Sequence, residues 1–260
     1  MIFDDLRPKI EKRLRELLTP FEPKLLYDAM AYYVFQEGKR IRPVLCVIGG
    51  YACDLDEEDA ITLGCAVEFI HNYSLIHDDM PELDNDDERR GKPTCHKIFG
   101  QDIALLAGDG LLSLAFDILS NESLYKNPEN LAKVVNYVSK NAGIEGMVAG
   151  QVYDIKGEKD FLKVASLKTA ALIKTSLVIP SILKGVDFSL YEKLGHNIGV
   201  LFQLTDDYHD KDGAYVVLGE KPLLKLIQDY KNNILTLINQ TNVSSYFKEY
   251  VDFIFCDLHH

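Results

Sequence analysis

The sequence has 260 residues, with 28 Lys and Arg against 40 Asp and Glu, which leaves a formal net charge of −12 at neutral pH. This acidity argues against a nucleic-acid partner, which needs a basic protein face, and against electrostatic binding to an anionic membrane. Hydrophobic residues make up 47% of the chain and charged residues 26%, a balance typical of a globular protein and not of a disordered one.

Apolar residues recur at three- and four-residue spacings along most of the chain, which predicts helices. In chain order, the predicted helices cover residues 8–18, 24–36, 42–53, 58–77, 101–119, 128–141, 160–183, 189–208 and 222–239, with one more near the C-terminus. Residues 58–77 are apolar nearly all round, which indicates a helix at the centre of a bundle. Strand-and-turn alternation, flexible linkers and internal repeats are absent from the sequence. We therefore expect one all-α domain, a helical bundle over residues 1–260.

Targeting signals are not visible in the sequence. The first residues lack a basic segment followed by an apolar one, so we expect no signal peptide. The most continuous apolar stretch, residues 44–53, is about half as long as a membrane span. The cysteines form no C-x-x-C pair, which favours free thiols in a reducing compartment; they are Cys46, Cys53, Cys65, Cys95 and Cys256. We expect a cytoplasmic protein without a stable membrane anchor.

Seven carboxylates lie within residues 78–88, directly after the apolar helix predicted over 58–77. Pro81 is expected to end that helix, because a proline cannot donate to the helical hydrogen-bond ladder. Carboxylates at the C-terminal end of a helix are unfavourable for the helix dipole, so their presence indicates a function. A solvated acidic loop is the alternative. An EF-hand is excluded, because its alternating ligands and central Gly are missing.

A second acidic motif ends the helix predicted over 189–208 and contains Gln203, Asp206, Asp207 and Asp210. Asp206 and Asp210 are four residues apart, so they differ by about 40° around a helix axis. Two apolar helices that each end in an Asp-Asp pair and a further Asp predict carboxylates that face one another, an oxygen-rich site suited to Mg²⁺. Mg²⁺ usually completes its coordination with water and phosphate oxygens, so the inferred ligand contains phosphate.

Basic residues that can neutralise a phosphate occur in three places: Lys39, Arg40 and Arg42; Arg89 and Arg90; and Lys168, which precedes Thr169. Each is a weak signal by itself, because most helical Lys and Arg are solvated. The Gly-x-x-x-x-Gly-Lys pattern is absent, which disfavours a nucleotide triphosphatase. Glu68 and His71 match one Glu-x-x-His element of a di-iron bundle, but that site needs a second element, which the sequence lacks.

In their order along the chain, these motifs resemble the trans-isoprenyl diphosphate synthases, the polyprenyl synthetase family that includes farnesyl and geranylgeranyl diphosphate synthases. The similar motifs are Gly-Lys-Arg-x-Arg-Pro at 38–43, His71 before Asp78, Asp-Asp-x-x-x-x-Asp at 78–84 with Arg-Arg-Gly after it, Lys168-Thr169, and Phe-Gln-x-x-Asp-Asp-x-x-Asp at 202–210. The resemblance covers about residues 30–212 and is strongest to bacterial farnesyl diphosphate synthase. It implies an all-α isoprenoid synthase fold with a central cavity, and a homodimer.

The resemblance also implies a role for each motif. Mg²⁺, three ions per active site, would be held by Asp78, Asp84, Asp206 and Asp210, with Asp79 and Asp207 in support. The allylic diphosphate would be bound by Arg89, Lys168 and Gln203, with Thr169 nearby. The diphosphate of isopentenyl diphosphate would be bound by Lys39, Arg42, His71 and Arg90. The implied reaction condenses isopentenyl diphosphate with dimethylallyl or geranyl diphosphate and releases pyrophosphate.

Product length is implied by Tyr73 and Ser74, which lie five and four residues before Asp78. In the family, an aromatic residue at the position of Tyr73 tends to stop elongation near fifteen carbons. The implied main product is therefore (2E,6E)-farnesyl diphosphate. Geranyl and geranylgeranyl diphosphate are the alternatives, as is an ordinary core role for Tyr73. A non-catalytic paralogue is a further alternative for the whole chain.

Two segments depart from the family's pattern. After Asp212 the chain passes directly to Gly213, where the family usually has a longer loop whose lysines touch the allylic diphosphate. Lys211 and Lys221 do not match those lysines and are not assigned their role. Either the loop is deleted, which would make the allylic site more open, or a segment is missing from this chain. The stretch between Asp154 and Lys168 is also short.

Overall fold

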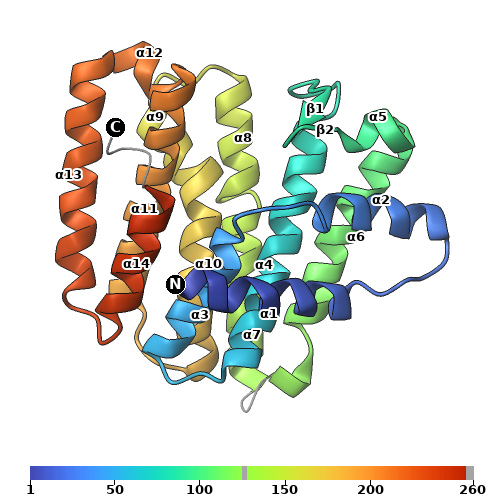
Figure 1. Cartoon of the computed structure of the whole chain (residues 1–260), viewed down its shortest axis with the longest axis horizontal. Coiled ribbons are helices and arrows are strands. Elements are labelled where there is room, and N and C mark those ends of the chain that lie inside the picture. The colour runs from blue at the N-terminus through green and yellow to red at the C-terminus, as the bar shows by residue number, and fades with distance from the viewer. Residues whose placement is uncertain (125–127, 256–260) are drawn as a thin grey trace.

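The computed structural model describes residues 1–124 and 128–255 and consists mainly of helices (Figure 1). The longer helices are α1 (Ile2–Leu17), α2 (Lys24–Val34), α3 (Ile41–Ala52), α4 (Glu57–Asp78), α6 (Gln101–Leu119), α7 (Pro128–Ala142), α10 (Ala171–Lys184), α11 (Ser189–Asp210), α13 (Glu220–Ile238) and α14 (Ser244–Ile254). The shorter elements are α5 (Cys95–Phe99), η1 (Glu122–Leu124), α8 (Met147–Ile155), α9 (Phe161–Val164), η2 (Ala165–Ala170) and α12 (Ala214–Leu218). β1 (Glu88–Arg89) and β2 (Lys92–Pro93) form one short antiparallel ladder. The predicted all-α bundle is confirmed.

Helix α4 lies at the centre of the bundle, as its sequence predicts. Its buried residues fall on every side between Ala60 and Ile76, and α3, α6 and α10 pack around it. Burying one large apolar side chain contributes about 1.5–3 kcal/mol, so a helix buried all round is firmly held. The helix ends at Asp78, three residues before Pro81, as expected. The first acidic motif is therefore attached to the most buried helix of the fold.

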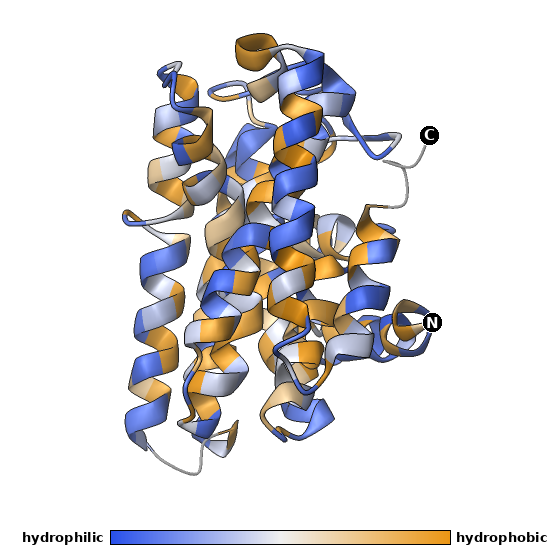
Figure 2. Ribbon diagram, turned by 90° about the vertical axis from the view of Figure 1, so that its left-hand side faces the viewer, coloured by the Kyte–Doolittle hydropathy of each residue, from blue (hydrophilic) through white to orange (hydrophobic). Residues whose placement is uncertain are grey.

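Helix α11 brings the second acidic motif to the same end of the bundle. It packs on α10 and α13, and its last turn and that of α4 both point to the end at which α12 and the β1–β2 ladder lie (Figure 1). Hydrophilic and hydrophobic residues alternate in blocks along the helices, as expected for amphipathic helices (Figure 2). Two acidic motifs that are more than a hundred residues apart in the chain thus share one end of the molecule.

Three helices and the small ladder were not predicted from periodicity. Helices α5 and α12 have five residues each and α8 has nine, so each gives too few repeats for a clear pattern. The segment predicted as one helix over 160–183 is divided into α9, the π-helical turn η2 and α10. A π-turn inserts an extra residue into a helix and occurs often at functional sites.

Close packing on both sides positions the π-turn η2, which contains Lys168 and Thr169. A Cβ atom on Gly150 of α8 would lie 2.2 Å from the backbone nitrogen of Lys168. A Cβ atom on Gly199 of α11 would lie 2.4 Å from the Cα of Ala170. Any larger residue would separate the turn from its neighbours, so these glycines allow α8 and α11 to approach it.

Cys46, Cys53, Cys65 and Cys95 are free, while Cys256 lies outside the described part of the chain. In residues 1–124 and 128–255, no helix combines the length and the apolar character that crossing a bilayer requires.

Candidate active site

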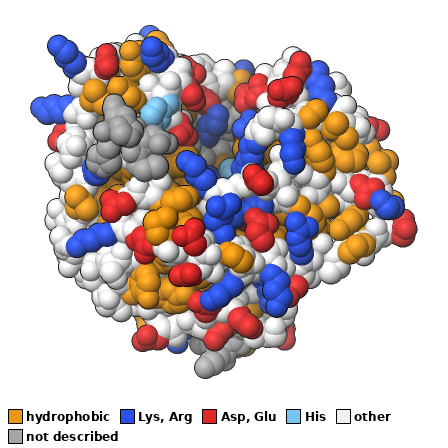
Figure 3. All heavy atoms as spheres, in the orientation of Figure 1, with side chains coloured by type: hydrophobic (Ala, Val, Ile, Leu, Met, Phe, Trp, Pro, Cys, Tyr) orange, Lys and Arg blue, Asp and Glu red, His pale blue; other side chains and the backbone are white. Residues whose placement is uncertain are grey.

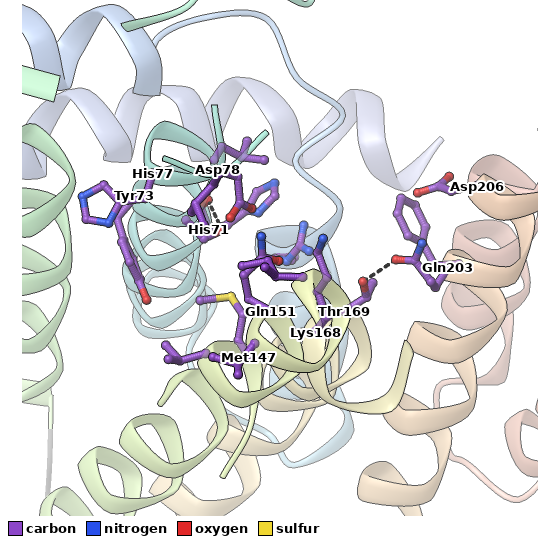
Figure 4. Close-up of a pocket in the computed structure, with 18 residues that line it drawn as sticks. His71, Tyr73, His77, Asp78, Met147, Gln151, Lys168, Thr169, Gln203 and Asp206 are labelled. Carbon is purple, nitrogen blue, oxygen red and sulfur yellow. Dashed lines mark hydrogen bonds between the residues drawn. The ribbon is translucent and has the colours of Figure 1, made fainter. Parts of the chain in front are cut away.

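A cavity of about 400 Å³ lies between the C-terminal ends of α4 and α11 (Figure 4). Its polar end contains Asp78 from α4, Gln203 and Asp206 from α11, and Lys168 and Thr169 from η2. Asp78 and Asp206 come from opposite sides of the cavity, with Lys168 and Thr169 between them (Figure 4). The remainder of the lining is mainly apolar and includes Tyr73, Ser74, His77, Met147, Val148, Gln151, Val152 and Ile155. The cavity therefore has a charged end and an apolar end.

A second cavity, of about 460 Å³, shares the walls formed by Arg42, His71, Leu75 and Phe202 with the first. Its other cationic residues are Lys39, Arg40, Arg89 and Arg90. In the space-filling view, basic and acidic side chains gather around a hollow at this end of the molecule (Figure 3). Cations from two distant segments thus meet in one place, whereas Lys168 lines only the first cavity. Two adjoining cavities that each contain cationic side chains result.

The two carboxylates of the first cavity are partly desolvated. Burial raises the pKa of Asp78 to about 6, the negative charge of Asp84 adds to this, and Lys168 opposes it. Burial likewise raises the pKa of Asp206 to about 6, together with the charges of Asp210 and Asp207. In both cases, burial and neighbouring negative charge outweigh the nearby positive charges. A cation in the cavity would supply further positive charge.

The donor set fits Mg²⁺ that is bound together with a phosphate ligand. Asp78 and Asp206 line the cavity, and the exposed Asp84 and Asp210 lie close enough to influence their charges. Within residues 1–124 and 128–255, no three His, Cys, Asp or Glu side chains are grouped closely enough to hold a metal ion. Mg²⁺ typically takes one or two carboxylates and completes its octahedron with water and phosphate oxygens.

The second carboxylate of the first motif, Asp79, is fully buried and held by two partners. Arg89 donates to Asp79 Oδ1 from Nε at 2.6 Å, and its Nη2 lies 2.6 Å from the same oxygen. The hydroxyl of Tyr33, on α2, donates to Asp79 Oδ2. Both carboxylate oxygens are therefore engaged inside the protein, and Asp79 fixes the guanidinium of Arg89 beside the second cavity. Sequence reasoning missed Tyr33, which lies 46 residues before Asp79.

The second carboxylate of the other motif, Asp207, is anchored in a similar way. It accepts hydrogen bonds from Gln203 Nε2 and from the backbone N–H of Ala214, both at 2.8 Å. Thr169 Oγ1 donates to Gln203 Oε1 at 2.5 Å, which joins η2 to α11. A Cβ atom on Gly213 would lie 2.5 Å from Asp207 Oδ2, and Gly213 has a φ of +46°. The short turn after Asp212 is thus closed directly onto Asp207.

The cations of the 38–43 segment have different environments. Arg40 is a structural residue, because it is 2% exposed and donates to Glu11, to Glu68 and to two backbone carbonyls. Arg42 is 8% exposed, yet its Nε has no hydrogen-bond partner. Burial, followed by the charge of Arg42, lowers the pKa of His71 well below its ordinary value, so the imidazole is neutral. Arg42 and His71 are available to an anion, whereas Arg40 is not.

Helix α8 adds two site residues that sequence reasoning did not assign. Asp154 Oδ2 lies 2.5 Å from Lys168 Nζ. Gln151 lines the first cavity, and both polar atoms of its side chain are buried without a hydrogen-bond partner. Neither residue falls in one of the motifs described above, and α8 has too few residues for its periodicity to predict the helix.

The chain belongs to the polyprenyl synthetase family: the family model described as Polyprenyl synthetase matches residues 23–250. The resemblance seen in the sequence is thereby confirmed. A farnesyl diphosphate synthase of Geobacillus stearothermophilus is 38% identical over 228 residues, which cover 84% of this chain and 77% of that protein. A chloroplastic geranylgeranyl pyrophosphate synthase of Capsicum annuum is 41% identical over 235 residues, which cover 85% of this chain but only 62% of that protein. The chain therefore spans less than two thirds of the length of that relative.

Solved structures of the family share the fold. An FPP/GFPP synthase from Zymomonas mobilis superposes with a TM-score of 0.90 at 32% identity, covering 96% of this chain and 95% of that one. A geranyltranstransferase from Thermotoga maritima superposes with a TM-score of 0.87 at 33% identity, covering 97% of this chain and 98% of that one. The fold likeness extends over nearly the whole chain.

Proposed function

We propose that the chain is a Mg²⁺-dependent trans-prenyltransferase that condenses isopentenyl diphosphate with dimethylallyl or geranyl diphosphate. Its main product is (2E,6E)-farnesyl diphosphate, with pyrophosphate released. The observation that supports this most directly is the pairing of Asp78 and Asp206 across a cavity whose other end is apolar. A diphosphate with a hydrocarbon tail fits both ends at once. The similarity to the farnesyl diphosphate synthase of Geobacillus stearothermophilus supports the same reaction.

The allylic diphosphate occupies the charged end of the first cavity. Asp78, Asp84, Asp206 and Asp210 hold Mg²⁺ there, and Lys168 neutralises a further part of the charge. Bound Mg²⁺ stabilises the negative charge that develops on the leaving pyrophosphate. The Thr169–Gln203 hydrogen bond fixes the polar wall between η2 and α11. These residues hold the diphosphate oxygens while the apolar lining excludes water from the hydrocarbon.

Isopentenyl diphosphate occupies the second cavity. Lys39, Arg42, His71 and Arg90 bind its diphosphate. The unpartnered Nε of Arg42 supports this assignment, because a buried donor without an acceptor costs about 1–3 kcal/mol that a phosphate oxygen recovers. Neutral His71 donates one N–H to the same anion. Arg89, which is held by Asp79, also lines this cavity. Its positive charge partly offsets the effect of burial, which raises the pKa of Asp78.

In the reaction, the C–O bond of the allylic diphosphate breaks and its electron pair leaves with pyrophosphate. The π electrons of isopentenyl diphosphate form the new C–C bond with the allylic carbocation. The departing pyrophosphate then accepts the proton that restores a double bond. The protein orients the two substrates and balances charge, and no side-chain nucleophile is required.

Tyr73 at the apolar end supports the fifteen-carbon product. Geranylgeranyl diphosphate is the second candidate, because relatives from Capsicum annuum and Catharanthus roseus are geranylgeranyl pyrophosphate synthases. To decide, the protein is incubated with isopentenyl diphosphate, an allylic diphosphate and Mg²⁺, and the products are separated by chain length. Mainly farnesyl diphosphate is expected. A mainly twenty-carbon product would favour the second candidate, and no condensation product would refute both.

We also propose that the chain forms a homodimer and is cytoplasmic. Leu105 and Leu106 on α6 are 46% and 52% exposed, which supports a second copy as the partner of this face. The free thiols of the described residues support a reducing compartment. Sedimentation equilibrium of the wild type and of Leu106→Glu tests the dimer. A mass of one chain for the wild type would contradict it.

A further inference from the structure

We propose that His77 is a specificity-determining residue. It packs against Tyr73, contacts the backbone of α6 and thereby holds Tyr73 in place, which limits the length of the product. The inference rests on the proposed prenyltransferase function and adds a residue that none of the sequence motifs assigns to product length. It follows from the contacts of His77 on three sides, with Tyr73, with α6 and with the first cavity.

The first contact joins His77 to Tyr73. The two residues are four apart on α4, so both point to the same side of that helix, and both line the first cavity. Their ring centroids are 5.5 Å apart, and the rings meet edge to face at 84°. They lie together on one side of the cavity, across from Gln203 and Asp206 (Figure 4). The barrier at this side thus consists of two rings in contact.

The second contact joins His77 to α6. His77 Nε2 lies 3.0 Å from the carbonyl oxygen of Leu105, within hydrogen-bond distance. A Cβ atom on Gly108 would lie only 2.1 Å from the same Nε2. The imidazole therefore fills the space that any side chain at 108 would need. Helix α6 lies on one side of the ring and the cavity on the other, so a side chain at position 108 would displace the ring away from α6 and toward the cavity.

A blocking side chain limits elongation only while it stays in place. Tyr73 is 8% exposed and lies beside the cavity, where a growing hydrocarbon would push against it. Contact with His77 transmits that push to the backbone of α6 through the Leu105 carbonyl. The barrier is as rigid as the packing of α4 on α6. This explains why an aromatic ring at the cavity wall can act as a stop.

Two substitutions should change product length in opposite directions. His77→Ala removes the contacts of the imidazole with Tyr73 and with α6 and leaves room beside Tyr73. The ratio of twenty- to fifteen-carbon product should therefore rise about tenfold, equivalent to about 1.4 kcal/mol. Gly108→Ala forces the imidazole toward the cavity, so the ratio of ten- to fifteen-carbon product should rise by a similar factor. His77→Phe keeps a ring but loses the hydrogen bond, and should lie between His77→Ala and the wild type.

Matched controls separate these effects from general damage. His196→Ala removes a half-buried histidine of α11 that does not line the cavity. Gly110→Ala adds a methyl group on the same helix as Gly108, but against the flexible side chain of Met30. Both controls should keep the product ratios of the wild type.

The decisive experiment has two readouts. Product lengths are measured from geranyl and isopentenyl diphosphate, and the Kd values for farnesyl and geranylgeranyl diphosphate are measured by calorimetry. His77→Ala should lower the Kd for geranylgeranyl relative to farnesyl diphosphate about tenfold. An unchanged Kd ratio in His77→Ala would overturn the inference, whether or not the wild type is active. Absence of any product from the wild type would overturn the proposed function instead, and the binding readout would still decide the role of His77.

Discussion

Lys168 Nζ lies 2.5 Å from Asp154 Oδ2, so the lysine that we propose binds the allylic diphosphate is ion-paired with a carboxylate of α8. The pair joins α8 to the π-turn η2 at the edge of the first cavity. A lysine has several rotatable bonds, and restricting them costs up to about 2 kcal/mol. The ion pair with Asp154 therefore restricts the positions open to the Lys168 side chain.

Asp154→Asn should therefore weaken use of the allylic substrate selectively. We expect kcat/KM for geranyl diphosphate to fall about tenfold, because Lys168 is no longer oriented by the carboxylate. This change corresponds to a loss of about 1.4 kcal/mol in transition-state stabilisation. The KM for isopentenyl diphosphate should stay within about twofold of the wild-type value. Glu158→Gln, which breaks the surface pair with Lys163, is the control. Equal losses for both substrates would argue against a role through Lys168.

Removing the charge of Asp78 should abolish turnover but stabilise the ligand-free protein. The folded-state pKa of about 6 lies above the ordinary value of 3.8, so this carboxyl favours the folded state at low pH and loses that contribution as pH rises to 6. Asp78→Asn cannot ionise, and at pH 7 it should be more stable by about 1 kcal/mol after allowance for solvent screening. Thermal unfolding at pH 7 and pH 4.5 tests this. If Asp78→Asn were stabilised as much at pH 4.5 as at pH 7, the stabilisation would not come from removing an ionised carboxylate.

Tyr33→Phe should destabilise the protein, because it leaves one oxygen of the buried Asp79 without its donor. The expected loss in the free energy of unfolding is about 1–3 kcal/mol. The KM for isopentenyl diphosphate should also rise, since Arg89 is held through Asp79 beside the second cavity. Tyr32→Phe is a matched control, because that hydroxyl donates to the carbonyl of Pro93 instead. Similar losses in both variants would show that Tyr33 has no special effect on Arg89.

Gly213→Ala should damage both the fold at the end of α11 and the site. A methyl group there would meet the carboxylate of Asp207 at 2.5 Å, and the φ of +46° is itself unfavourable for alanine. We expect a lower melting temperature, and activity should require a higher Mg²⁺ concentration than in the wild type. Gly219→Ala also has a positive φ but meets no atom, so it controls for backbone strain alone. If both variants behaved alike, the contact with Asp207 would be unimportant.

The sequence predicts the parts of this molecule that depend on local spacing. The apolar periodicity predicts α4 and α11, and the carboxylate spacing predicts Asp78 and Asp206 at their ends. Contacts between distant segments are not encoded in spacing. Tyr33 contacts Asp79 only because α2 packs on α4. His77 contacts Gly108 only because α6 also packs on α4.

Short and irregular elements are the second reason why some site residues could not be predicted from the sequence. Helix α8 has too few residues for a periodic signal, so its contributions, Gln151 and Asp154, were not assigned from the sequence. The π-turn η2 depends on packing against Gly150 and Gly199, which no local propensity describes. The functional chemistry was therefore predicted more fully than the residues that orient it.

The central claim is that the charged and apolar ends of one cavity act together in Mg²⁺-dependent carbon–carbon bond formation. It is tested most directly by incubating the wild type and Asp206→Asn with isopentenyl and geranyl diphosphate, with Mg²⁺ or with a chelator, and counting pyrophosphate and farnesyl diphosphate together. We predict equal amounts of the two products from the wild type with Mg²⁺, and at least about a hundredfold less from the variant or with chelator. Pyrophosphate without a longer prenyl product, or condensation that is independent of Asp206, would contradict the account.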